Sequence, residues 1–188
     1  MRIARLGFYS MVALLLIGCC IPLANSQMDV NVVATPTAIA SSQANEGVTS
    51  NCPVTQPQQP MFAAPPPNQA TAPWANEFWY GTESLWTALP KSGVWNGLPH
   101  NPEGYTQKVF WWRKGYSWTE EPKPALTVTG QRIDMPAPPL NVSTATNAFA
   151  EDIQSAMLVG VDFPTLGCWK ITGRYADAEL SFVVWVAP

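Results

Sequence analysis

The sequence predicts an all-β fold, an antiparallel sandwich formed by residues 74–188. Three observations support this fold class. Short segments alternate between apolar and polar side chains, which is the pattern of half-buried strands. Pro and Gly turns separate these segments, as they do in sandwiches. All nine Trp residues lie from Trp74 onward, so the large apolar side chains are concentrated in one region of ordinary domain size.

The end of the chain contains the clearest strands. Residues 168–175 and 177–186 both alternate, and the short link between them predicts a hairpin. Trp185 falls on the outward face beside Val183, so we expect residues 50–62 or a partner to cover this half-apolar face. The opposite face supplies the expected core residues, which are Trp169, Ile171, Phe182 and Val184.

Three further strands are expected from the same alternation, at residues 83–89, 125–134 and 155–163. The segment "NAFAEDIQSAM", residues 147–157, is the one place where a short helix also fits the sequence.

The stretch "VFWWRKGYSW", residues 109–118, combines aromatic rings with cations. On a strand, Trp111 and Trp112 point to opposite faces, so one of them belongs to the core. The other lies under a loop, under the N-terminal segment or in the open. One interpretation is an outer ring covered by Arg and Lys stems. The alternative is a ligand-binding patch of Trp112, Tyr116 and Trp118, in keeping with the aromatic bias of interfaces.

Residues 1–19 read as an export signal, with a cationic start followed by an uncharged apolar run over residues 6–18. "LIGC", residues 16–19, resembles the bacterial lipobox, which makes Cys19 the expected lipidated first residue of the mature protein. Cleavage after Ser26 and an uncleaved membrane anchor remain alternatives. The expected location is extracytoplasmic, anchored to the bacterial cell membrane, with secretion as the alternative.

Residues 20–73 read as a linker. They contain only two charged residues, Asp29 and Glu46, and are rich in Pro, Ala, Gln and Thr. Such a segment cannot bury enough apolar surface to offset the entropy of ordering, and its Pro content favours an extended spacer. The chain therefore divides into a signal peptide with a lipobox (1–19), a disordered Pro-rich tether (20–73) and a β-sandwich domain (74–188).

Cys52 and Cys168 remain available for pairing if Cys19 and Cys20 belong to the export signal. Two cysteines in an oxidising compartment most simply form a disulfide. Cys168 alternates away from the core face, so a disulfide there would hold the segment "NCPVTQP" against the outside of the sheet. Two unpaired thiols are the alternative.

The sequence contains few residues that could support catalysis or bind a ligand. Its single His, His100, lies in a turn-like stretch, and no nucleophile elbow, CxxC pair or zinc-ligand spacing is present. A copper site would use His100, Met135 and Met157, whose spacing gives no signal. We therefore expect a non-enzymatic protein with no cofactor and no metal. Nearly balanced charge without a basic stripe argues against nucleic-acid binding.

Three segments carry a resemblance to known proteins: "FWYGTESLWTALPKSGVWNGLP", "KVFWWRKGY" and "FPTLGCWKITGRYADAELSFVVWV". Together they resemble an uncharacterised family of secreted bacterial proteins and lipoproteins with a C-terminal immunoglobulin-like β-sandwich. The resemblance covers about residues 74–188 and implies an immunoglobulin-like fold and a cell-envelope location. The Cys…Trp…Cys core pattern of immunoglobulins is missing, and the resemblance assigns no catalytic or binding residue.

The expected function is that of a cell-envelope protein, held at the membrane by a lipid anchor, with a binding or structural role. Its expected partner is an envelope protein or a glycan. A carbohydrate-binding module is one alternative, and it requires several exposed, coplanar Trp or Tyr side chains. An envelope hydrolase or a metal-handling sandwich is the other alternative.

Overall fold

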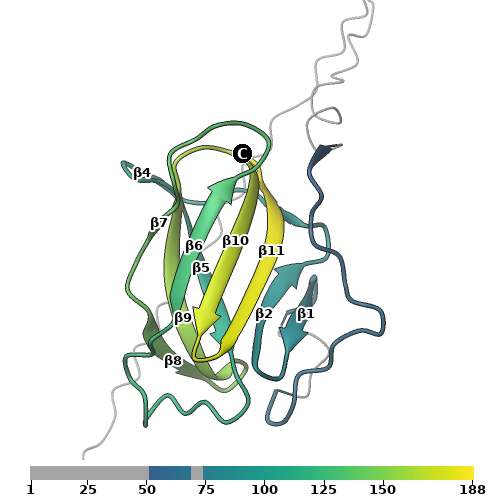
Figure 1. Cartoon of the computed structure of the whole chain (residues 1–188), viewed down its shortest axis with the longest axis vertical. Helices are drawn as coiled ribbons and strands as arrows, with labels where there is room; N and C mark the ends of the chain where they lie inside the picture. The colour runs from purple at the N-terminus through teal and green to yellow at the C-terminus, as the bar shows by residue number, and fades with distance from the viewer. Residues whose placement is uncertain (1–50, 69–73) are drawn as a thin grey trace, which may run out of the picture. The chain divides into compact units, whose positions relative to one another are not determined.

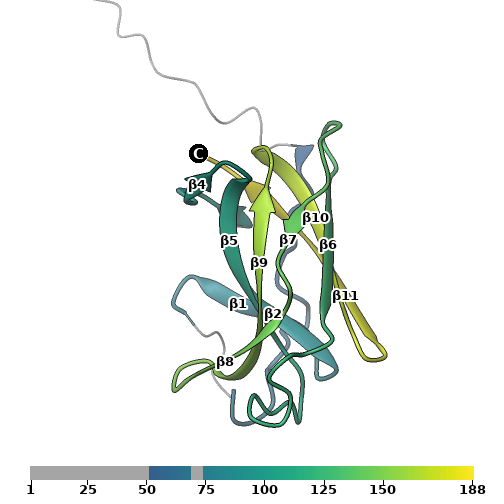
Figure 2. The same cartoon turned by 90° about the vertical axis from the view of Figure 1, so that its left-hand side faces the viewer.

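The computed structural model describes residues 51–68 and 74–188. In this part of the chain two β-sheets pack face to face, which confirms the all-β sandwich (Figures 1 and 2). The seven-stranded sheet has the order β1 (Glu77–Thr82), β2 (Leu85–Pro90), β5 (Gly104–Trp112), β9 (Gln154–Phe163) and β7 (Asn141–Val142), with β4 (His100–Asn101) on β5 and β8 (Thr146–Ala150) on β9. The four-stranded sheet has the order β3 (Val94–Trp95), β11 (Ala178–Val186), β10 (Gly167–Tyr175) and β6 (Thr127–Arg132).

The strand orders are those of an immunoglobulin-type sandwich. In such folds one sheet has the order A-B-E-D and the other the order C-F-G. Here β2-β5-β9-β7 follows the first order and β6-β10-β11 the second, in the same sequence along the chain. Every strand pair is antiparallel except β3 with β11, where Val94 lies opposite Trp185. The sandwich prediction is therefore confirmed down to its topology.

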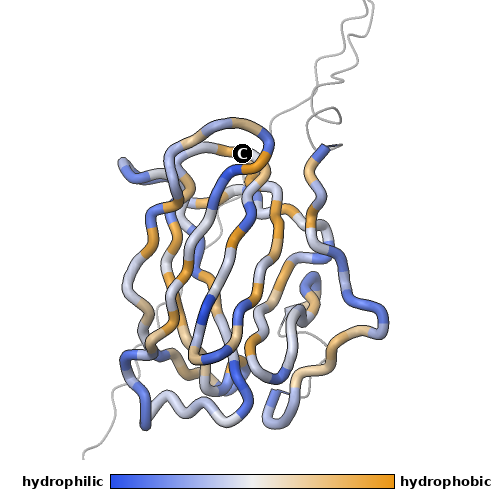
Figure 3. The backbone as a smooth tube through the Cα atoms, in the orientation of Figure 1, coloured by the Kyte–Doolittle hydropathy of each residue, from blue (hydrophilic) through white to orange (hydrophobic). Residues whose placement is uncertain are grey.

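The final hairpin has the expected register. Ile171 lies opposite Phe182, and Trp169 lies opposite Val184. All four side chains are buried between the sheets, none exposed by more than 2%. Figure 3 shows the underlying pattern, apolar positions alternating with polar ones along the strands. Alternation is a reliable guide here because this sheet has one covered and one largely open face.

Trp111 fills the centre of the inter-sheet core. Immunoglobulin domains join strands B and F with a disulfide at this level. In this protein Trp111, on β5, packs instead on Gly173, on β10. A Cβ atom at Gly173 would lie 2.5 Å from the Trp111 ring, so only glycine leaves room for the indole.

Residues 147–157 form a hairpin between β8 and β9, and the possible helix is absent. Ala148 lies opposite Ala156, and Gln154 takes a left-handed φ of 57° in the turn. So short a helix would have been marginal without tertiary support, whereas β9 offers a strand edge for pairing.

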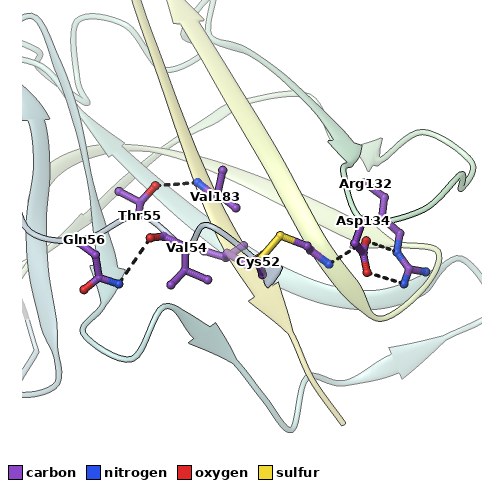
Figure 4. Close-up of a disulfide and its surroundings, with 9 residues drawn as sticks. Cys52, Val54, Thr55, Gln56, Arg132, Asp134 and Val183 are labelled. Carbon is purple, nitrogen blue, oxygen red and sulfur yellow. Dashed lines mark hydrogen bonds and ion pairs between the residues drawn. A yellow bond between two sulfur atoms is a disulfide. The ribbon is translucent and has the colours of Figure 1, made fainter. Parts of the chain in front are cut away.

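Residues 51–68, which their composition had assigned to the linker, are part of the folded domain. Cys52 forms a disulfide with Cys168, which confirms that pairing. The Thr55 amide donates to the Val183 carbonyl at 2.9 Å, and the Val183 amide donates to the Thr55 hydroxyl at 2.8 Å (Figure 4). Further along, the Gly81 amide donates to the Gln58 side chain.

Trp185 is covered, as expected for its half-apolar face. It lies opposite Cys168 on the outward face of the four-stranded sheet, and its exposed fraction is 9%. The disulfide places Cys52 on the same face. Met61 and Phe62 do not provide the cover: Met61 is exposed, and Phe62 packs on Trp86 of the other sheet.

A second apolar cluster lies on the outer face of the seven-stranded sheet. Its buried members are Ala64, Trp79, Trp86, Trp112, Ile153 and Ala156. Ala64 and the half-buried Phe62 bring the N-terminal segment onto this face. The two adjacent tryptophans therefore separate as alternation required, with Trp111 in the inter-sheet core and Trp112 under the N-terminal segment.

Candidate functional site

The loop that follows β5 lies at the end of the sandwich away from the C-terminus (Figure 1). This loop lines a cleft. The cleft has a volume of about 530 Å³. Its lining is polar and aromatic, made by Arg113, Lys114, Gly115, Tyr116, Ser117, Glu120 and Glu121 from the loop and by Tyr175 from the end of β10. The loop is folded back on itself, since the Glu121 amide donates to the Ser117 carbonyl at 3.1 Å.

Two tyrosines and one glutamate form the floor of this cleft. The Tyr116 and Tyr175 rings meet edge to face with their centroids 6.3 Å apart. The Tyr175 hydroxyl donates to the Glu121 carboxylate, and the Tyr116 hydroxyl donates to the Glu121 carbonyl at 2.9 Å. Burial, helped by the Glu121 carboxylate, raises the pKa of each phenol to about 12. Both tyrosines are therefore neutral hydrogen-bond donors at physiological pH.

The cations of the cleft have partners. The Arg113 guanidinium lies 5.6 Å from the centre of the Tyr175 ring and 3.6 Å from the Asp177 carboxylate. Lys114 pairs with Glu83 at 2.7 Å. The outer tryptophan, which was the ring expected under a cation, is Trp112 and lies under the N-terminal segment, and the cation of Arg113 lies over Tyr175 instead.

An exposed aromatic pair lies beside the cleft. Trp118 and Phe149 stack with their centroids 5.3 Å apart and their planes tilted by 21°. The Asn147 side-chain amide donates to the Trp118 carbonyl at 2.6 Å, which ties the loop to β8. The exposed fractions of Trp118 and Phe149 are 37% and 50%, so the stacked pair faces solvent.

The three residues of the predicted binding patch do not lie together. Trp112 is fully buried, and its indole donates to the Ile153 carbonyl at 2.8 Å, so it is not available to a ligand. Tyr116 is in the cleft and half-buried, while Trp118 is exposed beside it. Tyr116 and Trp118 therefore belong to the candidate site. Trp112 does not, because the N-terminal segment covers the outer face of its sheet.

The candidate site includes four residues that sequence reasoning did not assign to it, Glu120, Glu121, Tyr175 and Phe149. Nothing in the sequence distinguishes Glu120 and Glu121 from solvated loop charges, or Tyr175 from an ordinary strand residue. Phe149 lay in the segment read as compatible with a helix. The alternation of "TNAFA" was a usable signal for β8, but it does not say which loop the strand will meet.

The disulfide that holds the start of the N-terminal segment and the cleft lie at opposite ends of the sandwich. Cys52 bonds to Cys168 near the start of β10, and the cleft contacts Tyr175 at its end. At the usual rise per residue of a strand, these ends are about 20 Å apart. Figure 1 shows the segment entering near the C-terminus, away from the cleft loop.

Other predictions concern residues outside this site. Cys19 lies outside the described residues. The possible copper ligands are in different surroundings: His100 packs against the tilted ring of Tyr105 with centroids 4.6 Å apart, Met157 is buried, and Met135 is exposed. Within residues 51–68 and 74–188, no group of three metal-ligating side chains comes together. The same residues include no helix long and apolar enough to cross a membrane.

Comparison of the chain with family models, with curated proteins and with solved structures found no match in any of the three. The site must therefore be interpreted from its own chemistry. It combines an exposed aromatic surface with carboxylate and hydroxyl groups, while the phenol protons and the two cations already have partners. Such an arrangement can bind a ligand by stacking and by directed hydrogen bonds.

Proposed function

We propose that this protein is a binding domain of the bacterial cell envelope, anchored by a lipid on Cys19, that binds its ligand at its cleft. The anchor is supported by the apolar run and "LIGC" of residues 16–19. The compartment is supported by the Cys52–Cys168 disulfide, because such bonds persist in oxidising surroundings.

The observation that carries the proposal is the separation of attachment and cleft along β10. A chain tethered through its N-terminal segment is held at the Cys168 end of the sandwich. The cleft and Trp118 lie at the opposite end, so this attachment leaves them accessible. Recognition by loops at one end of a rigid sandwich is a common use of such folds.

The anchor is tested by metabolic labelling with a fatty-acid analogue in a bacterial host. The wild-type protein should be labelled, and the Cys19→Ser variant should not. Equal labelling of both proteins would contradict the lipid anchor.

The binding role is tested by sedimentation of the exported Cys19→Ser protein with isolated bacterial cell envelopes. The protein should sediment with envelopes, and Glu120→Arg in the cleft should reduce this severalfold. Glu103→Arg is the matched control, because Glu103 is an exposed glutamate in the turn between β4 and β5, at the other end of the sandwich. No sedimentation, or equal loss in both variants, would contradict the proposed function.

A further inference from the structure

We infer that the ligand of this surface is a neutral glycan chain whose pyranose rings carry equatorial substituents. This inference rests on the proposed function and names the ligand class of the same site. The site consists of the aromatic pair Trp118 and Phe149 together with the adjoining cleft.

The aromatic pair fits the flat face of a sugar ring. A pyranose with equatorial substituents presents only axial C–H groups on its two faces, and these weakly positive groups are attracted to the electron-rich face of an aromatic ring. Trp118 and Phe149 are both exposed to solvent, by 37% and 50%. The stacking of the two rings and the Asn147 bond to the Trp118 backbone hold them in place before a ligand arrives, which lowers the entropy lost on binding.

The cleft supplies hydrogen-bonding groups for sugar hydroxyls within the same loop. The Glu120 carboxylate is exposed and has no hydrogen-bond or ion-pair partner among the described residues, so both of its oxygens can accept. The Ser117 and Thr119 hydroxyls lie 3.0 Å apart on either side of Trp118 in the sequence. Each hydroxyl can both donate and accept, which matches the hydroxyls of a sugar.

The charges of the cleft disfavour an anionic ligand. Such a ligand would meet the carboxylates of Glu120 and Glu121. The two cations already have carboxylate partners, Asp177 and Glu83, so neither is free to neutralise an anion.

The exposed apolar surface is too small for a stable protein partner. A standard protein interface buries about 800 Å² on each side and involves roughly 20–30 residues a side. Here the exposed apolar surface beside the cleft consists of one stacked pair. An aromatic pair of this size with polar neighbours corresponds to one or two sugar rings of a chain.

The experiment measures binding of the exported full-length Cys19→Ser protein to cellohexaose and to chitohexaose by isothermal titration calorimetry. At least one of these neutral hexasaccharides should bind saturably. Trp118→Ala and Phe149→Ala should each weaken binding by about tenfold, the loss expected for one stacking interaction. Trp74→Ala is the matched control, because Trp74 is exposed to the same extent, 38%, and packs on Phe110 rather than on Phe149. Thermal unfolding of each variant verifies that it remains folded.

The outcomes separate the inference from the proposed function. Sedimentation with envelopes that depends on Glu120, without binding of either hexasaccharide, would overturn the glycan inference and leave the binding role standing. Binding that is unchanged in Trp118→Ala and Phe149→Ala, or equally weakened in Trp74→Ala, would overturn the assignment of the site. Binding lost only in the Trp118 and Phe149 variants supports the inference.

Discussion

The seven-stranded sheet buries tryptophans on both of its faces, but the two faces are covered in different ways. On the inner face, Trp111 lies under the strands of the four-stranded sheet. On the outer face, Trp79, Trp86 and Trp112 lie under the N-terminal segment. A sheet supplies cover through many paired backbone groups, whereas a single segment must be held by a few contacts. The inner cluster should therefore withstand changes that open the outer one.

The N-terminal segment, which covers the outer cluster, is held at several points along residues 52–68. The disulfide fixes one end, and the Asn68 side chain donates to the Ile153 carbonyl at 3.0 Å near the other. The same carbonyl accepts the Trp112 indole at 2.8 Å, so one backbone oxygen joins the segment, the sheet and the β8–β9 turn. The Cys52–Cys168 bond spans 116 residues of sequence, and in the chain-entropy model a loop of that size is worth about 4–5 kcal/mol.

The largest effect is expected in the inner cluster, from Phe182→Ala. Phe182 packs against Trp111, with centroids 5.7 Å apart, and against Trp95 at 6.1 Å. Truncating a fully buried Phe should lower the free energy of unfolding by about 3–5 kcal/mol. Denaturant unfolding measures the loss, with Glu179→Ala on the exposed side of the same strand as control. A near-neutral Phe182→Ala would mean that the register of β11 is wrong.

Removing the disulfide should open the outer cluster and spare the inner one. In the double variant Cys52→Ser, Cys168→Ser, we expect a loss of about 2–5 kcal/mol in the free energy of unfolding. Acrylamide should quench tryptophan fluorescence more strongly in this variant, because Trp79, Trp86 and Trp112 lose cover. The near-ultraviolet circular dichroism of the packed core should persist. If the circular dichroism signal is lost together with the protection of the tryptophans from acrylamide, the two clusters are one cooperative unit.

A smaller effect is expected from Phe62→Ala, which removes one ring of the outer cover. Phe62 is half-buried and lies 5.9 Å from the Trp86 ring centre. Its loss should lower the free energy of unfolding by about 1–2 kcal/mol, in proportion to the apolar area it buries. The same substitution should have almost no effect in the double cysteine variant, because residues that share one structural element are not additive. An equal cost in both backgrounds would show that the segment stays in place without the disulfide.

The smallest effect is a pH dependence at the border of the outer cluster. Burial raises the pKa of the Glu77 carboxyl from its usual 4.5 to about 7, and one of its oxygens has no hydrogen-bond partner within the described residues. The folded state therefore holds this proton more tightly than the unfolded chain does. The stability that Glu77 contributes is fully present below pH 4.5 and is lost as the pH rises through 7. Urea unfolding from pH 5 to 8 should show this decline in the wild type and a flatter profile in Glu77→Gln. The same slope in both proteins would rule out Glu77 as its cause.

The sequence allowed much of the four-stranded sheet to be predicted and less of the candidate site. The β10–β11 hairpin has a short link and strict alternation, so its core residues were found from local pattern alone. The two-residue strands β3 and β7 are too short to show any period. Tyr116 and Trp118 were identified as candidates because they follow an aromatic strand. Tyr175 and Phe149 approach them only because distant strands end at the same place.

The sequence by itself determined which side chains share a face, which segments pair as the final hairpin, and which two cysteines join. These properties depend on neighbours along the chain, or on which cysteines remain, and they need no three-dimensional search. The tertiary structure alone decided which faces are covered. Trp112 and Trp118 are both tryptophans of the same aromatic stretch, yet one is buried and the other faces solvent. The difference arises from residues 51–68, a Pro-rich segment whose composition looks like a linker until the disulfide and a layer of indole rings give it a surface to pack on.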